Sequence, residues 1–166
     1  MCYVKAVYFD LKSCCEEFVK GVELLEQSAI AEAVDCFYRA CQRVTPEDPY
    51  FFKYSACYGL AVLLDGDARG LDICRMAAQK TPLDADVALN LVRAEAFVAN
   101  RKAAVNTLEQ YLRLQSEHHG LRAMQQKLGV RGRKPIPFLS RNHKLNVMLG
   151  KWLRRKKSTV TFFNML

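Results

Sequence analysis

A three-position pattern that recurs at intervals of 37 and 34 residues limits what this chain of 166 residues can fold into. In each copy a small residue is followed four positions later by an apolar residue, and three positions after that by a small or aromatic one. On an α-helix these positions share one face. The copies are Ala33, Phe37 and Ala40; Gly70, Cys74 and Ala77; and Ala104, Leu108 and Tyr111. The pattern predicts a repeated helical unit.

Each copy has a second helical segment upstream, separated from it by only a short turn. These segments are residues 16–28, 50–64 and 84–99. Helices joined this tightly must pack antiparallel. Between the pairs, residues 45–49 and 81–84 combine proline with acidic residues, which stop one helix and begin the next. We therefore expect an all-α domain with antiparallel pairs near residues 10–43, 49–80 and 84–116.

Over residues 16–116 the chain resembles the tetratricopeptide repeat family. The family pattern of Ala, Phe and Ala is matched by Ala33, Phe37 and Ala40, with Gly21 upstream, and Ala104 begins the match in the third repeat. The family Trp is absent from every repeat, and Glu95 stands where the third repeat would have Tyr. The resemblance implies a right-handed solenoid of antiparallel helical hairpins with a C-terminal capping helix. An irregular helical bundle is the alternative.

Charge divides the chain into two parts. Residues 1–117 hold 13 Lys or Arg and 17 acids, a balance of −4, whereas residues 118–166 hold 12 Lys or Arg and no acid. We expect a repeat domain over residues 1–129, capped by a helix at 119–129, and a basic extension over 130–166. A basic amphipathic helix near residues 143–156 is predicted by the helical spacing of Leu145, Met148, Leu149, Trp152 and Leu153.

The sequence favours a cytoplasmic protein. It has no run of 18 apolar residues for a bilayer-spanning helix, and residues 1–10 are too short and too polar for a signal peptide. The seven cysteines are odd in number and show no Cys-x-x-Cys spacing, which fits a reducing compartment.

We expect no catalytic centre, cofactor or metal. The adjacent His118 and His119 point to different faces of a helix and are interpreted as a solvated helix end. The cysteines lack a neighbouring His or a Gly-rich turn that would indicate an activated nucleophile, and no phosphate-binding Gly-Lys-Ser/Thr motif is present. An enzyme is the class that the sequence supports least.

The resemblance implies a scaffold that binds an extended peptide or a helix of another protein. In the family the partner lies on a concave face lined by the first helix of each pair. The positions that this implies here are Phe18, Val22, Phe52, Ser55, Gly59, Asp86, Leu89, Asn90, Arg93 and Ala96. Packing or exposure to water is an equally good interpretation for each of them.

The acid-free extension indicates an alternative function, the peripheral binding of an anionic surface such as acidic phospholipid or nucleic acid. Its candidate anion-binding residues are Lys151, Arg154, Arg155, Lys156 and Lys157. We expect residues 130–145 to dock on the acidic body and residues 154–157 to stay available to an acidic partner.

Overall fold

The computed structural model describes residues 7–8, 10–130, 143–145 and 147–149, and every regular element among them is helical. The all-α expectation is therefore confirmed for this part of the chain. The chain divides into two compact units, Met1–Val130 and Arg131–Leu166. In the second unit residues 144–145 and 147–149 are helical, and the backbone N–H of Val147 donates to the carbonyl of His143 at 3.1 Å.

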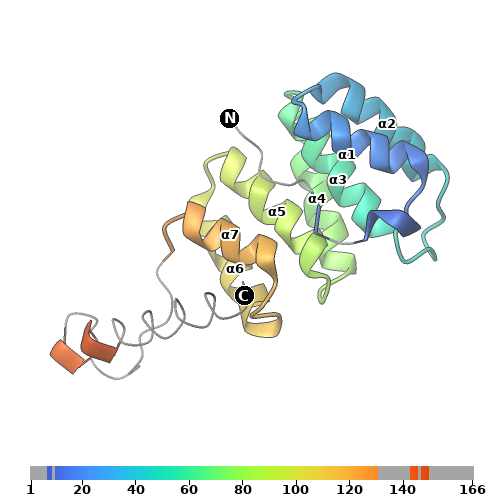
Figure 1. Cartoon of the computed structure of the whole chain (residues 1–166). Helices are drawn as coiled ribbons and strands as arrows, with labels where there is room; N and C mark the ends of the chain where they lie inside the picture. The colour runs from blue at the N-terminus through green and yellow to red at the C-terminus, as the bar shows by residue number, and fades with distance from the viewer. Residues whose placement is uncertain (1–6, 9, 131–142, 146, 150–166) are drawn as a thin grey trace, which may run out of the picture. The chain divides into compact units, whose positions relative to one another are not determined.

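The first unit is a succession of short helices that pack against their neighbours (Figure 1). A 3₁₀ turn, Leu11–Ser13, precedes the first of them. The α-helices are α1 (Glu16–Glu26), α2 (Ile30–Gln42), α3 (Phe51–Leu64), α4 (Arg69–Lys80), α5 (Ala85–Phe97), α6 (Arg101–Leu114) and α7 (His119–Lys127). The bounds of α1 to α6 fall inside the three expected pairs, and α7 falls inside the helix expected at residues 119–129. Within the described ranges, no helix has the length and apolarity to cross a bilayer.

Each pair of helices packs through the recurring pattern, whose positions are all buried. In the first pair Phe37 of α2 packs against Gly21 of α1, where an added Cβ would approach the Phe37 ring to 2.8 Å. In the second pair two backbones meet directly. A Cβ on Gly70 of α4 would lie 2.3 Å from the carbonyl oxygen of Gly59 and 2.4 Å from the backbone nitrogen of Leu63, both in α3. In these two pairs the small residues thus determine how closely the helices approach each other.

The first helix of every pair ends in the same turn. The backbone N–H donors of Ala29, Asp67 and Asn100 each bond the carbonyl five residues earlier, at 2.9, 3.1 and 2.9 Å. The residue before each donor (Ser28, Gly66 or Ala99) has a positive φ, which completes a Schellman motif. α7 ends in this way too, with Gly129 at φ 61° and Val130 donating to Gln125 at 3.0 Å. By its ending, α7 resembles α1, α3 and α5.

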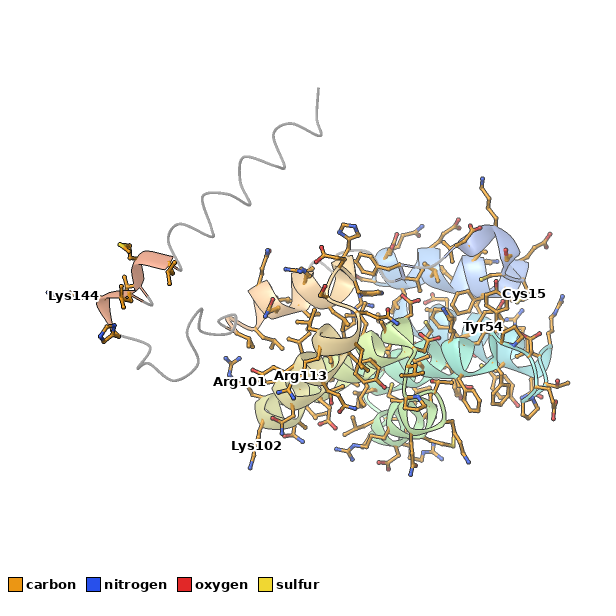
Figure 2. All side chains as sticks on the ribbon, turned by 90° about the horizontal axis from the view of Figure 1, so that it is seen from below. Cys15, Tyr54, Arg101, Lys102, Arg113 and Lys144 are labelled. Atoms are coloured by element: carbon orange, nitrogen blue, oxygen red, sulfur yellow. The ribbon has the colours of Figure 1, made fainter. Side chains whose placement is uncertain are left out.

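Aromatic rings fasten α1 to α3. The Tyr54 ring stacks on Phe18 at a centroid distance of 4.2 Å and an interplanar angle of 14°. Its hydroxyl oxygen accepts the backbone N–H of Cys15 at 3.0 Å, and Figure 2 shows the two residues side by side. Because Cys15 is the N-cap of α1 and has no side-chain cap bond, the Tyr54 hydroxyl fixes the start of that helix from the neighbouring pair.

We predict that Ala99→Gly stabilises the protein. Ala99 has φ 61°, a conformation that strains a residue with a Cβ by about 1–2 kcal/mol, whereas glycine adopts it freely. Glycine also gives the unfolded chain more freedom, so the net gain in unfolding free energy should be about 0.5–1 kcal/mol. Ala103→Gly, inside α6, is the matched control and should lower it by a similar amount. Urea unfolding followed by circular dichroism measures both changes, and a loss of stability in Ala99→Gly would contradict the prediction.

Candidate functional site

One side of α5 gathers polar side chains from three parts of the first unit. Asp86, Asn90 and Arg93 follow one another along α5 at spacings of four and three residues, which places them on one face of the helix. Polar atoms from α3 and from the residue that begins α7 meet this face. We call the α5 polar face the set Lys53, Cys57, Asp86, Asn90, Arg93 and His118.

Asp86 is the centre of this face because both of its carboxylate oxygens are used. The Lys53 Nζ donates to Oδ2 at 3.1 Å and lies 3.5 Å from Oδ2 of Asp84. The His118 Nε2 lies 3.1 Å from Oδ1 of Asp86. The other ring nitrogen, Nδ1, accepts the backbone N–H of Leu121 at 3.2 Å and so caps α7. These partners assign the hydrogen to Nε2, which donates it to Asp86.

The carboxylates beside Lys53 favour its charged form. Burial lowers the pKa of Lys53, but the carboxylates of Asp84 and Asp86 outweigh it, so the net shift of the pKa is upward. The side chains of Lys53 and Asp86 keep exposed fractions of 20% and 16%. The stability linked to Lys53 is therefore complete at neutral pH and is lost only as the pH rises through the raised pKa. Fixed charges thus persist on this face under ordinary conditions.

A second group of contacts on the face centres on the neutral amide of Asn90 and is more deeply buried. The Asn90 Nδ2 donates to Sγ of Cys57 at 3.2 Å, and the Arg93 Nη1 donates to Oδ1 of Asn90 at 3.2 Å. Arg93 is only 8% exposed although it carries a charge. Burial raises the pKa of the Cys57 thiol to about 12, with Arg93 and Asn90 opposing the shift. Cys57 is therefore a protonated acceptor at neutral pH and not a nucleophile.

The contacts across the face join residues about one repeat length apart. Lys53 and Asp86 are separated by 33 positions, as are Cys57 and Asn90, and Asp86 and His118 are separated by 32. Lys53 and Cys57 lie on α3, Asp86 and Asn90 lie on α5, and His118 is the N-cap of α7. The face is therefore a ladder that runs from α3 across α5 to the start of α7.

The structure brings together three of the partner-binding positions that the resemblance implied, Asp86, Asn90 and Arg93. Three others lie in the core, since Phe18, Val22 and Leu89 are 0%, 2% and 1% exposed. Their apolar side chains fill the space between helices and offer a partner no surface.

The remaining four positions lie apart from the α5 polar face. Gly59 is at the close crossing of α3 and α4, and the Ser55 hydroxyl donates to the carbonyl of Phe51 at 2.8 Å. Phe52 is half-buried against a cluster of α3, α4 and α5 residues, and Ala96 is half-buried against the cluster around Leu108.

Sequence reasoning missed Lys53, Cys57 and His118. The interpretation of His118 as a solvated helix end is wrong, because its side chain is only 14% exposed and bonds both Asp86 and the α7 backbone. His119 is exposed as expected. The signal that could have found these residues is the separation of 32 or 33 positions, close to the repeat interval of 34.

Glu95 forms an ion pair in which the carboxylate is buried and the Arg75 side chain is 47% exposed. Glu95 is 4% exposed, and its Oε1 accepts from Nε and Nη2 of Arg75 in α4 at 3.0 and 2.9 Å. Its Oε2 has no hydrogen-bond partner among the described residues. The pair links α4 to α5. It is thus a structural link between two helical pairs.

Among the described residues, no group of three or more His, Cys, Asp or Glu side chains is arranged to hold a metal ion. The anion-binding candidates Lys151, Arg154, Arg155, Lys156 and Lys157 lie outside the described residues. No protein-family model matches the chain, and no curated protein matches its sequence.

The buried thiols give a test of this geometry. We predict that iodoacetamide at pH 8 alkylates Cys57 and Cys74 at least about tenfold more slowly than Cys14, because burial raises both pKa values to about 12 and leaves few thiolates. Cys14 is half-exposed and serves as the internal control. Peptide mass spectrometry over a time course measures the rates, and denaturant should make them equal. Equal rates in the native protein would show that Cys57 is not buried under this face.

Proposed function

We propose that this chain is a non-catalytic protein-interaction module of the tetratricopeptide type. The observation that carries the proposal is the α5 polar face, on which charged and amide groups from successive helices are held in fixed positions. Recurring turns support a repeat architecture, because α1, α3, α5 and α7 all end in a Schellman motif. The small-residue contacts inside the first two pairs support it as well.

The chemistry of the face favours a peptide as the partner. An extended chain carries a backbone donor and an acceptor at nearly every residue. The Asp86 carboxylate is 16% exposed and can accept a further donor beside Lys53 and His118. The Asn90 amide has a second hydrogen and a second acceptor lone pair beyond its bonds with Cys57 and Arg93. A face of this composition recognises polar main-chain groups through hydrogen bonds, while the flanking apolar clusters accept alternate side chains. The proposed partner is therefore an extended segment of another protein.

We predict that Asp86→Asn weakens partner binding about tenfold, since losing one charge-assisted hydrogen bond costs about 1.5 kcal/mol or more. The amide keeps the shape of the carboxylate but removes its charge. Immobilised wild type, Asp86→Asn and Asp35→Asn, an exposed position on α2, are used to capture proteins from native extract. Quantitative mass spectrometry should show partners that Asp86→Asn recovers poorly and Asp35→Asn recovers in full. Equal recovery by all three proteins, with cooperative melting of each, would contradict the proposed role of the face.

A second function is favoured by the second unit. Leu145, Val147 and Met148 are 45%, 42% and 61% exposed on a helical segment that also exposes Lys144. Apolar side chains exposed on a basic helix suit the headgroup region of an anionic membrane. We therefore propose as the alternative that the extension holds the protein at an acidic phospholipid surface, with residues 151–157 supplying further cations.

We predict that the full chain sediments with vesicles of phosphatidylcholine and phosphatidylserine at 3:1, but not with neutral vesicles. Changing Arg154, Arg155, Lys156 and Lys157 to Ser should weaken this binding on the order of a thousandfold, because each cation contributes about 1 kcal/mol near an anionic surface. Salt-sensitive binding to RNA without vesicle binding would assign the extension to nucleic acid. If neither anion binds at low salt, the cations serve only solubility.

A further inference from the structure

Two consecutive residues that precede the first helix, Val7 and Tyr8, are packed into two different parts of the core. Neither belongs to a regular element. Val7 is 5% exposed and lies in the cluster built by α1, α2 and α3. Tyr8 packs against the cluster built by α5, α6 and α7. Neighbouring side chains that reach opposite sides are characteristic of extended backbone, so this short segment bridges the two halves of the first unit as a peptide would.

Val7 fills an aliphatic seat beside the α5 polar face. Its cluster contains Phe18 and Val22 of α1 together with Tyr54 and Cys57 of α3. Cys57, a member of the same cluster, accepts from Asn90, so this cluster extends to the α5 polar face. A β-branched aliphatic side chain is enclosed here almost completely.

Tyr8 fills an aromatic seat at the other side of the same face. Its ring lies 5.8 Å from the His118 ring, centroid to centroid, at an interplanar angle of 56°. Gly120 leaves room for it, because a Cβ there would lie 2.8 Å from both Cδ2 and Cε2 of Tyr8 and 2.4 Å from Cδ2 of Leu89. His118 in turn bonds Asp86, so the position of the Tyr8 ring lies beside the charged part of the α5 polar face.

We propose that Val7 and Tyr8 are an internal competitor for the partner segment, and that the partner carries, like them, an aliphatic residue followed by an aromatic one. This inference rests on the proposed peptide-binding function and adds the class of ligand and its regulation. The two packing positions suit an aliphatic and an aromatic side chain, because Val7 and Tyr8 already occupy them. A partner must displace the tethered segment to reach the α5 polar face.

Tethering sets the size of the effect. A segment joined by a short linker has an effective concentration on the order of 1 mM at its own seat. If the free segment binds with a Kd of about 0.1 mM, its tethered copy fills the seats about nine-tenths of the time. The apparent affinity for an external peptide then falls about tenfold, in proportion to the fraction of open seats.

The test uses a fluorescent synthetic peptide of residues 3–13 and the full chain. Fluorescence anisotropy measures its binding to wild type, to Tyr8→Ala and to Val7→Ala, with Tyr38→Ala as the control because Tyr38 is 51% exposed on α2, away from both seats. We expect each seat variant to bind the peptide about tenfold more tightly than wild type or the control. A peptide that itself carries Tyr8→Ala should bind every protein weakly. The rate of Cys57 alkylation should rise in both seat variants as the covering segment leaves.

Each result decides the inference once cooperative melting shows that the variants fold. Equal peptide affinity for wild type and the seat variants, or no binding to either variant, overturns it. A wild-type dimer that Tyr8→Ala dissolves also overturns it, because the seats would then belong to a second copy. These outcomes are separate from the Asp86→Asn capture. Extract partners that depend on Asp86 without any peptide binding would keep the proposed function and remove only the competitor.

Discussion

The close approach of α3 and α4 at Gly59 and Gly70 governs the rest of the first unit. A Cβ on Gly70 would lie 2.3 Å from the Gly59 carbonyl oxygen, so no other residue fits without separating the helices. Such a shift would carry α3 away from α5, because α3 packs on both α4 and α5. Lys53 and Cys57 reach their partners on α5 only when α3 holds this position. The polar face therefore depends on a contact made between backbones on the other side of the same helix.

The pairing of helices could be predicted from the sequence, but the rotation of each helix could not. Small residues at Ala33, Gly70 and Ala104 mark the inner faces of the second helices, and all three are buried. The first helices carry no equally strict mark. An error of one residue in the alignment of a helix corresponds to a rotation of about 100°. Such a rotation moves a side chain from the concave face to the interface within a helical pair. The resemblance implies that Gly59 lies on the concave face, but it lies against Gly70.

The polar ladder illustrates the second limit of single-sequence reasoning. No local sequence pattern distinguishes Lys53 from the other Lys and Arg residues, or His118 from its neighbour His119. They are distinguished by the packing of successive helices, because each lies 32 or 33 positions from Asp86, its partner on α5. The repeat interval is visible in the sequence, and it predicts the positions of the helices. Applied to polar residues of the first helices, the same interval pairs Lys53 with Asp86 and Cys57 with Asn90.

The depth of the ladder constrains what can cover it. Arg93 and Asn90 are 8% and 3% exposed, and the Asn90 amide already donates to Cys57 and accepts from Arg93. The charged side chains of Lys53 and Asp86 keep exposed fractions of 20% and 16%, and a purely apolar cover would remove their remaining water at a cost in free energy. A helix already uses its main-chain groups internally. An extended segment brings unused backbone donors and acceptors and, at alternate positions, apolar side chains for the flanking clusters. Val7 and Tyr8 supply those side chains within this chain, so the requirements of the polar face and the chemistry of its present cover agree.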